Sequence, residues 1–355
     1  MIAGSKCFPI EEYFRKVAKE KSDTFPTNSD YWERYWSMLT VLREQFYKKI
    51  NIGLAVHSGS IAGVYTDHSG DHFDEVVKYA GKLAGIDNDE ENSQLRPFEV
   101  YLLLMGIRLH DVGNIFGRAG HEKRALDVFK ASTAAASRDR FETQAINKIA
   151  QCHGGKRADG SKDTISELAE TDHLGSSTPF RPRMVAALVR LADEICEHRG
   201  RVSRHDIEAG LIPEHNLLYH LYADAIRSSV VNRREKSVTI EYVLHKKYLI
   251  DPYKVSSDAS TTKYLLDEVI DRLAKLNLER IYCNQFLDPP LQISLVRATL
   301  NIVDGPDEDE QELLKHKVEI RPEGYPTDDV GWRKQVQGYT GAEMKQQLAN
   351  IGGLV

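Results

Sequence analysis

The chain has 355 residues, of which 41% are hydrophobic and 28% charged, and its 47 basic and 53 acidic side chains give a formal net charge of −6. This composition is typical of a globular protein and excludes collagen-like, coiled-coil and intrinsically disordered chains. The negative charge also argues against a dedicated duplex-DNA binder, because such proteins usually carry a dominant basic face. The length predicts two domains, or one large domain with appended segments.

We expect the protein to be cytoplasmic, with no membrane partner. No segment approaches the roughly 18 consecutive apolar residues of a membrane span, since the most apolar one, 100–109, is broken by Arg108. The N-terminus lacks the basic start and apolar stretch of a secretory signal. The four cysteines are too few and too scattered for a disulfide framework, so we expect them to be reduced.

The first 56 residues have the spacing of helices. Aromatic and aliphatic residues recur at helical intervals after Asp30, which is a suitable N-cap. Asp71 is expected to cap a later helix in the same way, and Pro97 suits the first turn of another. Because that helix, 98–110, is apolar nearly all round, we expect it to be central.

Helical patterns continue to about residue 200. Gly113 lies just beyond the central helix, where a left-handed cap is common. Further helices are expected at about 121–135, 140–153 and 183–198.

From about residue 206 the pattern changes to mixed α and β. Segments 237–250 and 291–303 are rich in β-branched and aromatic residues and predict strands, with an amphipathic helix, 261–276, between them. The acidic run 304–312 and the polar end of the chain are expected to be solvated surface or linker.

The expected fold is mainly α, with a helical core followed by a smaller α+β domain. The expected parts are a helical N-terminal segment (1–56), a core domain (57–205), an α+β accessory domain (206–325) and a polar tail (326–355).

Histidines and aspartates recur on the apolar faces of the predicted helices. His72, His121 and His153 each point toward the packed side of their helix. Asp193 lies at the edge of an apolar stripe, where an unpaired carboxylate would be costly. Arg190, three residues earlier, could pair with it in a purely structural role. Each histidine taken alone could equally be a core residue hydrogen-bonded to the backbone.

A metal centre would explain all of these positions together. Imidazoles supply nitrogen ligands, and carboxylates supply oxygen ligands and negative charge. His110 and Asp111 adjoin at the end of the central helix, from which both can face one cavity. Asp111, with two oxygens, is suited to bridge two ions about 3.5 to 4 Å apart that together bind a phosphate.

The ordered set of these residues resembles the HD superfamily of metal-dependent phosphohydrolases. The resemblance covers about residues 57–205 and rests on the strings DHSGDHFDEVVKYA, LLLMGIRLHDVGNIFGRAGHEKRA and ALVRLADEI. They are most similar to HD domains that elsewhere precede chaperone-type ATPases. The GYP motif of the HD-GYP subgroup is missing, so cyclic di-GMP hydrolysis is not implied.

The resemblance implies an HD-type helical bundle and a set of metal ligands. His72, His110, Asp111 and Asp193 match the core ligands of one metal. His121 and His153 match the additional histidines of two-metal members, which resemble phosphodiesterases.

Other polar residues flank this set. His68 could contact the ligands without binding metal or could add a further ligand, or it could simply lie at the surface near the start of the helix. Asn114 could orient a water molecule or a phosphate oxygen, which with Asp111 makes it a candidate catalytic residue. Cations near the site could bind phosphate or could simply be solvated. The candidate substrate-binding cations are Arg118, Lys123, Arg124, Lys156 and Arg157.

The expected activity is hydrolysis, by a metal-activated water, of a phosphoester in a nucleotide or a short, linear or cyclic oligonucleotide. The expected cofactors are two divalent metal ions, for which mixed nitrogen and oxygen ligands suit manganese, iron, cobalt, nickel or zinc, with magnesium also open. One alternative is a metal-dependent single-strand nuclease, and another is a nucleotide-binding signalling module without turnover. The sequence leaves the oligomeric state and the role of the α+β domain open.

Overall fold

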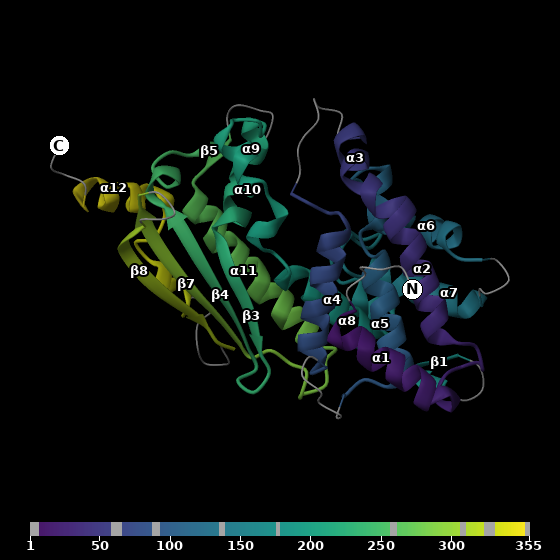
Figure 1. Ribbon diagram of the computed structural model, residues 1–355. Helices are drawn as coiled ribbons and strands as arrows, with labels where there is room; N and C mark the ends of the chain where they lie inside the picture. The colour runs from purple at the N-terminus through teal and green to yellow at the C-terminus, as the bar shows by residue number, and fades with distance from the viewer. Residues whose placement is uncertain are drawn as a thin grey trace. The chain divides into compact units, whose positions relative to one another are not determined.

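Contacts along the chain divide the molecule into two units. The computed structural model (Figure 1) describes residues 7–57, 66–86, 93–134, 139–174, 178–255, 261–305, 310–322 and 331–351. Of these, residues 7–57, 67–196 and 282–292 belong to the first unit, and residue 66, residues 197–281 and those from 293 onward belong to the second. The first unit is mostly helical, and the second combines helices with a four-stranded sheet. The expected combination of a mainly helical part and a smaller α+β part is therefore confirmed.

The N-terminal helices begin at residues suited to helix starts. α1, Pro9–Glu20, has a proline in its first turn, where the missing N–H costs nothing. α2, Tyr31–Val41, is capped by Asp30, whose Oδ1 accepts a hydrogen bond at 2.9 Å from the backbone N–H three residues later. A π-helical turn, Leu42–Tyr47, leads into α3, Lys48–His57. The expected helices and the Asp30 cap are confirmed.

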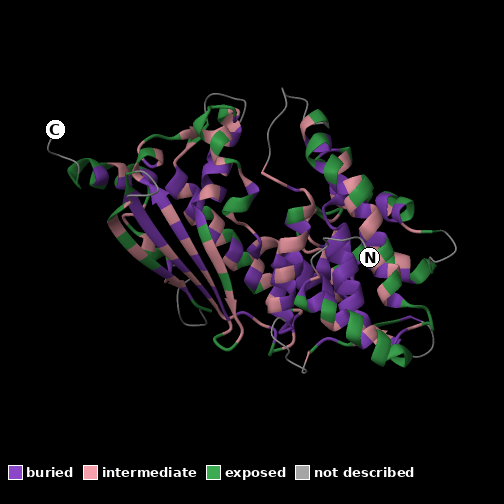
Figure 2. Cartoon of the chain, viewed as in Figure 1, coloured by how far each residue is buried: buried purple, intermediate pink, exposed green. Residues whose placement is uncertain are grey.

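α5, Pro97–Leu109, is the central helix of the first unit. Every residue after Pro97 is buried, as its apolar composition predicts (Figure 2). α5 packs against α1, α2, α4, α6, α7 and α8. The bounds of the last four are Gly70–Ala84, Ala125–Ser132, Arg140–Gln151 and Pro182–Ile195. Two 3-10 turns, η3 (Val112–Phe116) and η4 (His121–Arg124), connect α5 to α6.

Arg108 is the polar residue that interrupts the apolar sequence of α5. It is fully buried, and its guanidinium contacts the carboxylates of Glu11 and Asp74 and the hydroxyl of Tyr35. A buried cation is tolerated only when it is paired in this way. Because Glu11 lies on α1, this ion-pair network fastens the N-terminal helices to the core of the first unit.

The sheet of the second unit has the strand order β3-β4-β7-β8. These strands span Ile226–Asn232, Ser237–His245, Leu295–Asp304 and Gln311–Ile320. β4 and β7 are parallel, and the outer pairs are antiparallel. Parallel neighbours require a long crossover connection, and α11, Leu265–Asn284, supplies it. The last residues of α11, from Tyr282, belong to the first unit.

The remaining elements are short. They are η1 (Ser22–Thr24), η6 (Ile165–Glu167), β1 (Asp172–Leu174), β2 (Thr178–Phe180), η7 (Arg199–Arg201), α9 (Arg204–Glu208), α10 (Glu214–Ala225), η8 (Lys246–Tyr248), β5 (Tyr253–Lys254), β6 (Thr262–Lys263), η9 (Arg333–Val336) and α12 (Gly341–Ile351). Within the described ranges, no helix combines the length and the apolar character needed to cross a membrane.

Some local predictions are wrong. Asp71 lies inside α4, whose N-cap position is Ser69, because a turn held by the Asp67 carboxylate precedes the helix. The strand expected to reach residue 250 ends at His245. It ends there because its partner strand β7 ends one residue after the position paired with His245.

The polar end of the chain is more ordered than its composition predicts. Within the expected polar tail, helix α12 buries Met344 and Leu348, which lie one helical turn apart. The backbone N–H of Gly341 donates a hydrogen bond to Asp267 on α11 at 2.7 Å. The segment expected to be solvated surface or linker therefore contains a packed helix. Residues 326–330 and 352–355 of the expected tail lie outside the described residues.

Candidate metal centre

The structure brings together all six residues that the sequence proposes as metal ligands. His72 comes from α4, His110 and Asp111 from the end of α5, and the others from η4, the turn after α7, and α8. Their ligand atoms form overlapping groups in which all atoms lie within 4.8 Å of one another. The groups are His68, His72 and Asp111; His72, His110 and Asp193; and Asp111, His121 and His153. We refer to these seven residues as the ligand cluster.

One group places two imidazoles around one carboxylate oxygen. Nε2 of His72 lies 3.3 Å from Oδ1 of Asp193, and Nε2 of His110 lies 3.5 Å from the same atom. Two ligand atoms bound tetrahedrally to one metal ion, each about 2.1 Å from it, lie roughly 3.4 Å apart. The spacing of this group therefore fits one bound ion.

The second group lies on the other side of Asp111. Oδ1 of Asp111 is 2.8 Å from Nε2 of His121 and 3.3 Å from Nε2 of His153. The two imidazole nitrogens are 3.2 Å apart. These distances also match ligands that share one ion.

Asp111 connects the two groups through its two oxygens. Oδ1 faces His121 and His153, whereas Oδ2 lies 3.8 Å from Nε2 of His72 and 3.9 Å from Nε2 of His110. The carboxylate is 5% exposed. A buried carboxylate with one oxygen toward each group has the geometry of a bridging ligand.

Backbone carbonyls orient three of the imidazoles. Nδ1 of His110 lies 2.7 Å from the carbonyl oxygen of Ile107, and Nδ1 of His121 and of His153 lie 2.9 and 2.6 Å from the carbonyls three residues earlier. A carbonyl only accepts, so each Nδ1 must carry the proton and donate it. In the neutral imidazole this leaves the lone pair on Nε2, directed at the ligand cluster, as in metal-binding histidines.

The cluster contains two carboxylates, the buried Asp111 and the partly buried Asp193, whose negative charge a cation would neutralise. Nε2 of His110 is buried and has no hydrogen-bond partner among the described residues. Burial lowers the pKa of His110, but the Asp193 and Asp111 carboxylates raise it, to about 9. Burial raises the pKa of Asp193, yet the neighbouring His110 and His72 hold it well below its usual range. Donor types, spacing and charge all fit divalent metal ions.

Gly113 has a different role from the left-handed cap predicted for it. The described glycines with positive φ do not include Gly113, so it does not adopt a left-handed conformation. A Cβ atom at Gly113 would lie 2.0 Å from the backbone oxygen of His121. Glycine is therefore needed because η4, which carries His121, passes directly against η3.

Of the other polar residues proposed for the site, His68, itself a member of the ligand cluster, and Arg118 lie near the Asp111 carboxylate, and Asn114 lies three residues after Asp111 in the next turn. Nδ1 of His68 is 3.1 Å from Oδ2 of Asp111 and approaches from the turn before α4. A guanidinium nitrogen of Arg118 is 3.9 Å from the same oxygen, and the Arg118 side chain is 54% exposed. Asn114 is fully buried, and neither polar atom of its amide has a hydrogen-bond partner in the described part of the chain.

Comparison with known proteins gives one result. Residues 62–274 match the family HD-CE. The chain belongs to the HD-CE family. The match covers the whole ligand cluster and continues through β3 and β4 into α11. Neither the curated proteins nor the solved structures contain a match.

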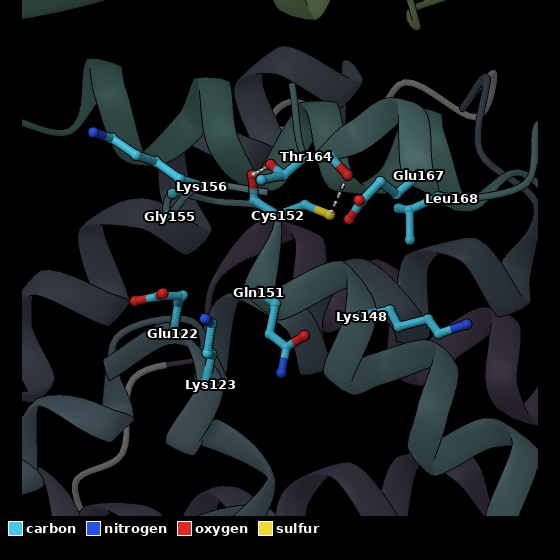
Figure 3. Close-up of a pocket in the computed structure, with 11 residues that line it drawn as sticks. Glu122, Lys123, Lys148, Gln151, Cys152, Gly155, Lys156, Thr164, Glu167 and Leu168 are labelled. Carbon is cyan, nitrogen blue, oxygen red and sulfur yellow. Dashed lines mark hydrogen bonds between the residues drawn. The ribbon is translucent and has the colours of Figure 1, made fainter. Parts of the chain in front are cut away.

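The candidate substrate-binding cations of the HD-CE chain fall into two classes. Arg124 pairs with Asp127 and stacks on the ring of Phe116, and Arg157 pairs with three surface carboxylates. These two arginines are thus occupied by other partners. Arg118 reaches Asp111, and Lys123 and Lys156 line a cleft beside the ligand cluster (Figure 3).

Arg190 does not adopt the structural pairing with Asp193 that the sequence left open. Its guanidinium donates to the carbonyls of Cys152 and Lys162 and to the hydroxyl of Thr164. Its target is the loop after His153, whose folded path the sequence pattern does not reveal. Asp193 therefore stays directed at His72 and His110.

Proposed function

We propose that this HD-CE protein is a metal-dependent phosphohydrolase that acts on a nucleotide or on a short, linear or cyclic oligonucleotide. The observation that carries the proposal is the position of Asp111, whose two oxygens face two separate groups of histidines. If the cluster only stabilised the fold, we would expect fewer charged side chains in it, because burying ionisable residues usually costs free energy. Membership of an HD-type family supports the same chemistry.

Each ligand has a defined task in this proposal. His72, His110 and Asp193 would hold one divalent ion, and His121 and His153 would hold another. Asp111 would bridge the two. The bound ions would supply Lewis acidity and an acidified water molecule. Manganese, iron, cobalt, nickel, zinc and magnesium all remain candidates for this mixed donor set.

The surrounding residues would position the substrate and its protons. Arg118, exposed at the edge of the cluster, would bind a nonbridging phosphate oxygen, for which a guanidinium is well suited. The buried amide of Asn114 would orient a water molecule or a phosphate oxygen. His68, through its contact with Oδ2 of Asp111, would fix the orientation of the bridging carboxylate.

The first test compares Asp111→Ala with Asp127→Ala. Asp127 is an exposed aspartate on α6 that pairs with Arg124, so it serves as a matched control outside the cluster. Metal content is measured by elemental analysis, and turnover is measured on mononucleotides, dinucleotides, cyclic dinucleotides and single-stranded DNA supplied with Mn²⁺. We expect Asp111→Ala to lose bound metal and at least about a thousandfold in kcat/KM, because both ions lose a ligand. Asp127→Ala should retain both.

Three outcomes would redirect the proposal. Unchanged metal content and turnover in Asp111→Ala would refute it. Cleavage of long single strands with steep salt dependence would favour the nuclease, since several phosphates would then be contacted. Tight nucleotide binding by metal-loaded protein without any product would favour a signalling module.

A further inference from the structure

A cleft of about 380 Å³ lies beside the ligand cluster in the first unit. Figure 3 shows one wall formed by Glu122, Lys123, Gln151 and Lys148 and a facing wall formed by Lys156, Cys152, Thr164 and Glu167. Glu122 directly follows His121 in sequence, and Cys152 and Gly154 flank His153. The cleft therefore adjoins the turns that carry two of the ligands, His121 and His153.

The loop that forms one wall is firmly held. Arg190, which is 5% exposed, donates to the carbonyls of Cys152 and Lys162 and to the hydroxyl of Thr164. The hydroxyl of Tyr282 donates to Oδ1 of Asp163 and accepts from the backbone N–H of Ile165, both at 2.9 Å. These contacts come from α8 and from the end of α11. The cleft is therefore a preformed feature, as ligand sites usually are.

The charges around the cleft favour an anion. None of Lys123, Lys148 and Lys156 has an ion-pair partner among the described residues, and all three are exposed. Of the two glutamates in the walls, Glu167 pairs with Arg157. Oε2 of Glu122 lies 3.6 Å from Nδ1 of His121. Among the described residues no lysine or arginine pairs with Glu122, so one carboxylate stands against the three lysines. The net charge of the walls is still positive and is spread along both of them, which suits an extended anion better than a single compact one.

We propose that this cleft binds a second phosphate of the substrate, next to the phosphate that is hydrolysed. The inference rests on the proposed hydrolase function and narrows its substrate class to molecules with at least two phosphates. Lysine ammonium groups recognise phosphate as point charges. The second phosphate could belong to a polyphosphate chain or to the next nucleotide of a phosphodiester, since both present the same chemistry to the lysines.

Binding to metal-free protein tests the cleft without any catalysis. We would titrate inorganic tripolyphosphate and orthophosphate into wild type, Lys148→Glu, Lys156→Glu and Lys19→Glu by calorimetry. Lys19 is exposed on α1 and gives the same change of charge outside the cleft. Tripolyphosphate should bind more tightly than orthophosphate, and each cleft variant should raise its Kd about three- to tenfold. Lys19→Glu should change it by less than about twofold. Equal Kd values in wild type and both cleft variants would overturn the inference.

Turnover separates this inference from the proposed function. The measured quantity is the ratio of kcat/KM for 5′-phosphorylated diadenylate, or for ATP, to kcat/KM for bis(p-nitrophenyl) phosphate, which has one phosphate. The ratio should fall about three- to tenfold in the cleft variants and stay constant in Lys19→Glu. The substrate whose ratio falls identifies the source of the second phosphate. If the single-phosphate ester is hydrolysed but no ratio changes, the function stands and the cleft assignment falls. If nothing is hydrolysed while tripolyphosphate binding depends on the lysines, the cleft still binds polyphosphate, but the hydrolase falls and with it the assignment of that phosphate to a substrate.

Discussion

At the scale of single residues, the protonation state of His110 sets how the metal affinity of the ligand cluster depends on pH. Burial lowers its pKa, but the carboxylates of Asp193 and Asp111 raise it to about 9, above the ordinary 6.5. In the metal-free protein the imidazole is therefore protonated on both nitrogens at neutral pH. A bound ion must displace the proton on Nε2. We expect the affinity for Mn²⁺ to rise with pH up to about 9, by at most about tenfold per pH unit, and then to level off.

Competition with a metal-sensitive chelator over this pH range would measure the effect. Asp193→Asn serves as the comparison, because removing the carboxylate lowers the pKa of His110 and should flatten the dependence. That variant also loses one ligand, so only the slope of its Mn²⁺ affinity against pH is compared with that of the wild type. The absolute affinities are not compared. An affinity for Mn²⁺ that does not vary with pH in the wild type would contradict the prediction.

The residues of the ligand cluster were largely accessible to sequence reasoning, and those of the cleft were not. His72, His121 and His153 stand out because each falls on the apolar face of a helix expected from the sequence, a local signal, although the structure places His121 in η4 and His153 in the turn after α7. His68 precedes the start of α4, so helical spacing says nothing about its contact with Asp111. The cleft depends on how Arg190 holds the loop after His153, and that contact spans 38 residues of sequence.

At the scale of elements, the approach of η4 to η3 determines whether the second group of ligands forms. Gly113→Ala would place Cβ 2.0 Å from the backbone oxygen of His121, so η4 must move. We expect the variant to lose the ion held by His121 and His153, to bind one ion instead of two, and to lose about 1 to 3 kcal/mol of stability. Metal stoichiometry and thermal unfolding would measure these effects.

Gly81→Ala is a suitable control for this prediction. Its Cβ would lie 3.3 Å from the side chain of Ile10, a tight contact in the core away from the ligand cluster. Because alanine favours the helix while the contact with Ile10 is tight, the stability should stay within about 1 kcal/mol of wild type, and the metal stoichiometry should be unchanged. If Gly113→Ala kept its full metal content, the proposed role of this close contact would be wrong.

The four strands of the sheet show which elements local sequence patterns can predict and which they cannot. β4 and β7 were predictable because their β-branched and aromatic residues suit a buried strand. β3 and β8 were not predicted. β3 contains two serines and an asparagine, and β8 contains four charged residues and a histidine, so neither has a strong strand signal. Both form because β4 and β7 offer them open edges for backbone hydrogen bonds.

At the scale of the whole molecule, bound metal should stabilise the first unit selectively. The ligands come from α4, α5, η4, α8 and the turn after α7, so ions would cross-link elements distant in sequence. Binding to the folded state alone adds about 2.7 kcal/mol when the free metal concentration is a hundred times Kd. No member of the ligand cluster lies in the second unit.

Hydrogen exchange with and without metal would test this selectivity across the chain. Adding Mn²⁺ to chelator-treated protein should slow amide exchange in α4, α5 and α8 and leave β4 and β7 unchanged, because only the first group of elements carries ligands. In Asp111→Ala the slowing should disappear. Slowing that is equal in the helices and in the sheet would show that metal acts on the whole chain rather than through this cluster. Such a result would contradict the assignment of the ions to these residues, even if the protein were an active hydrolase.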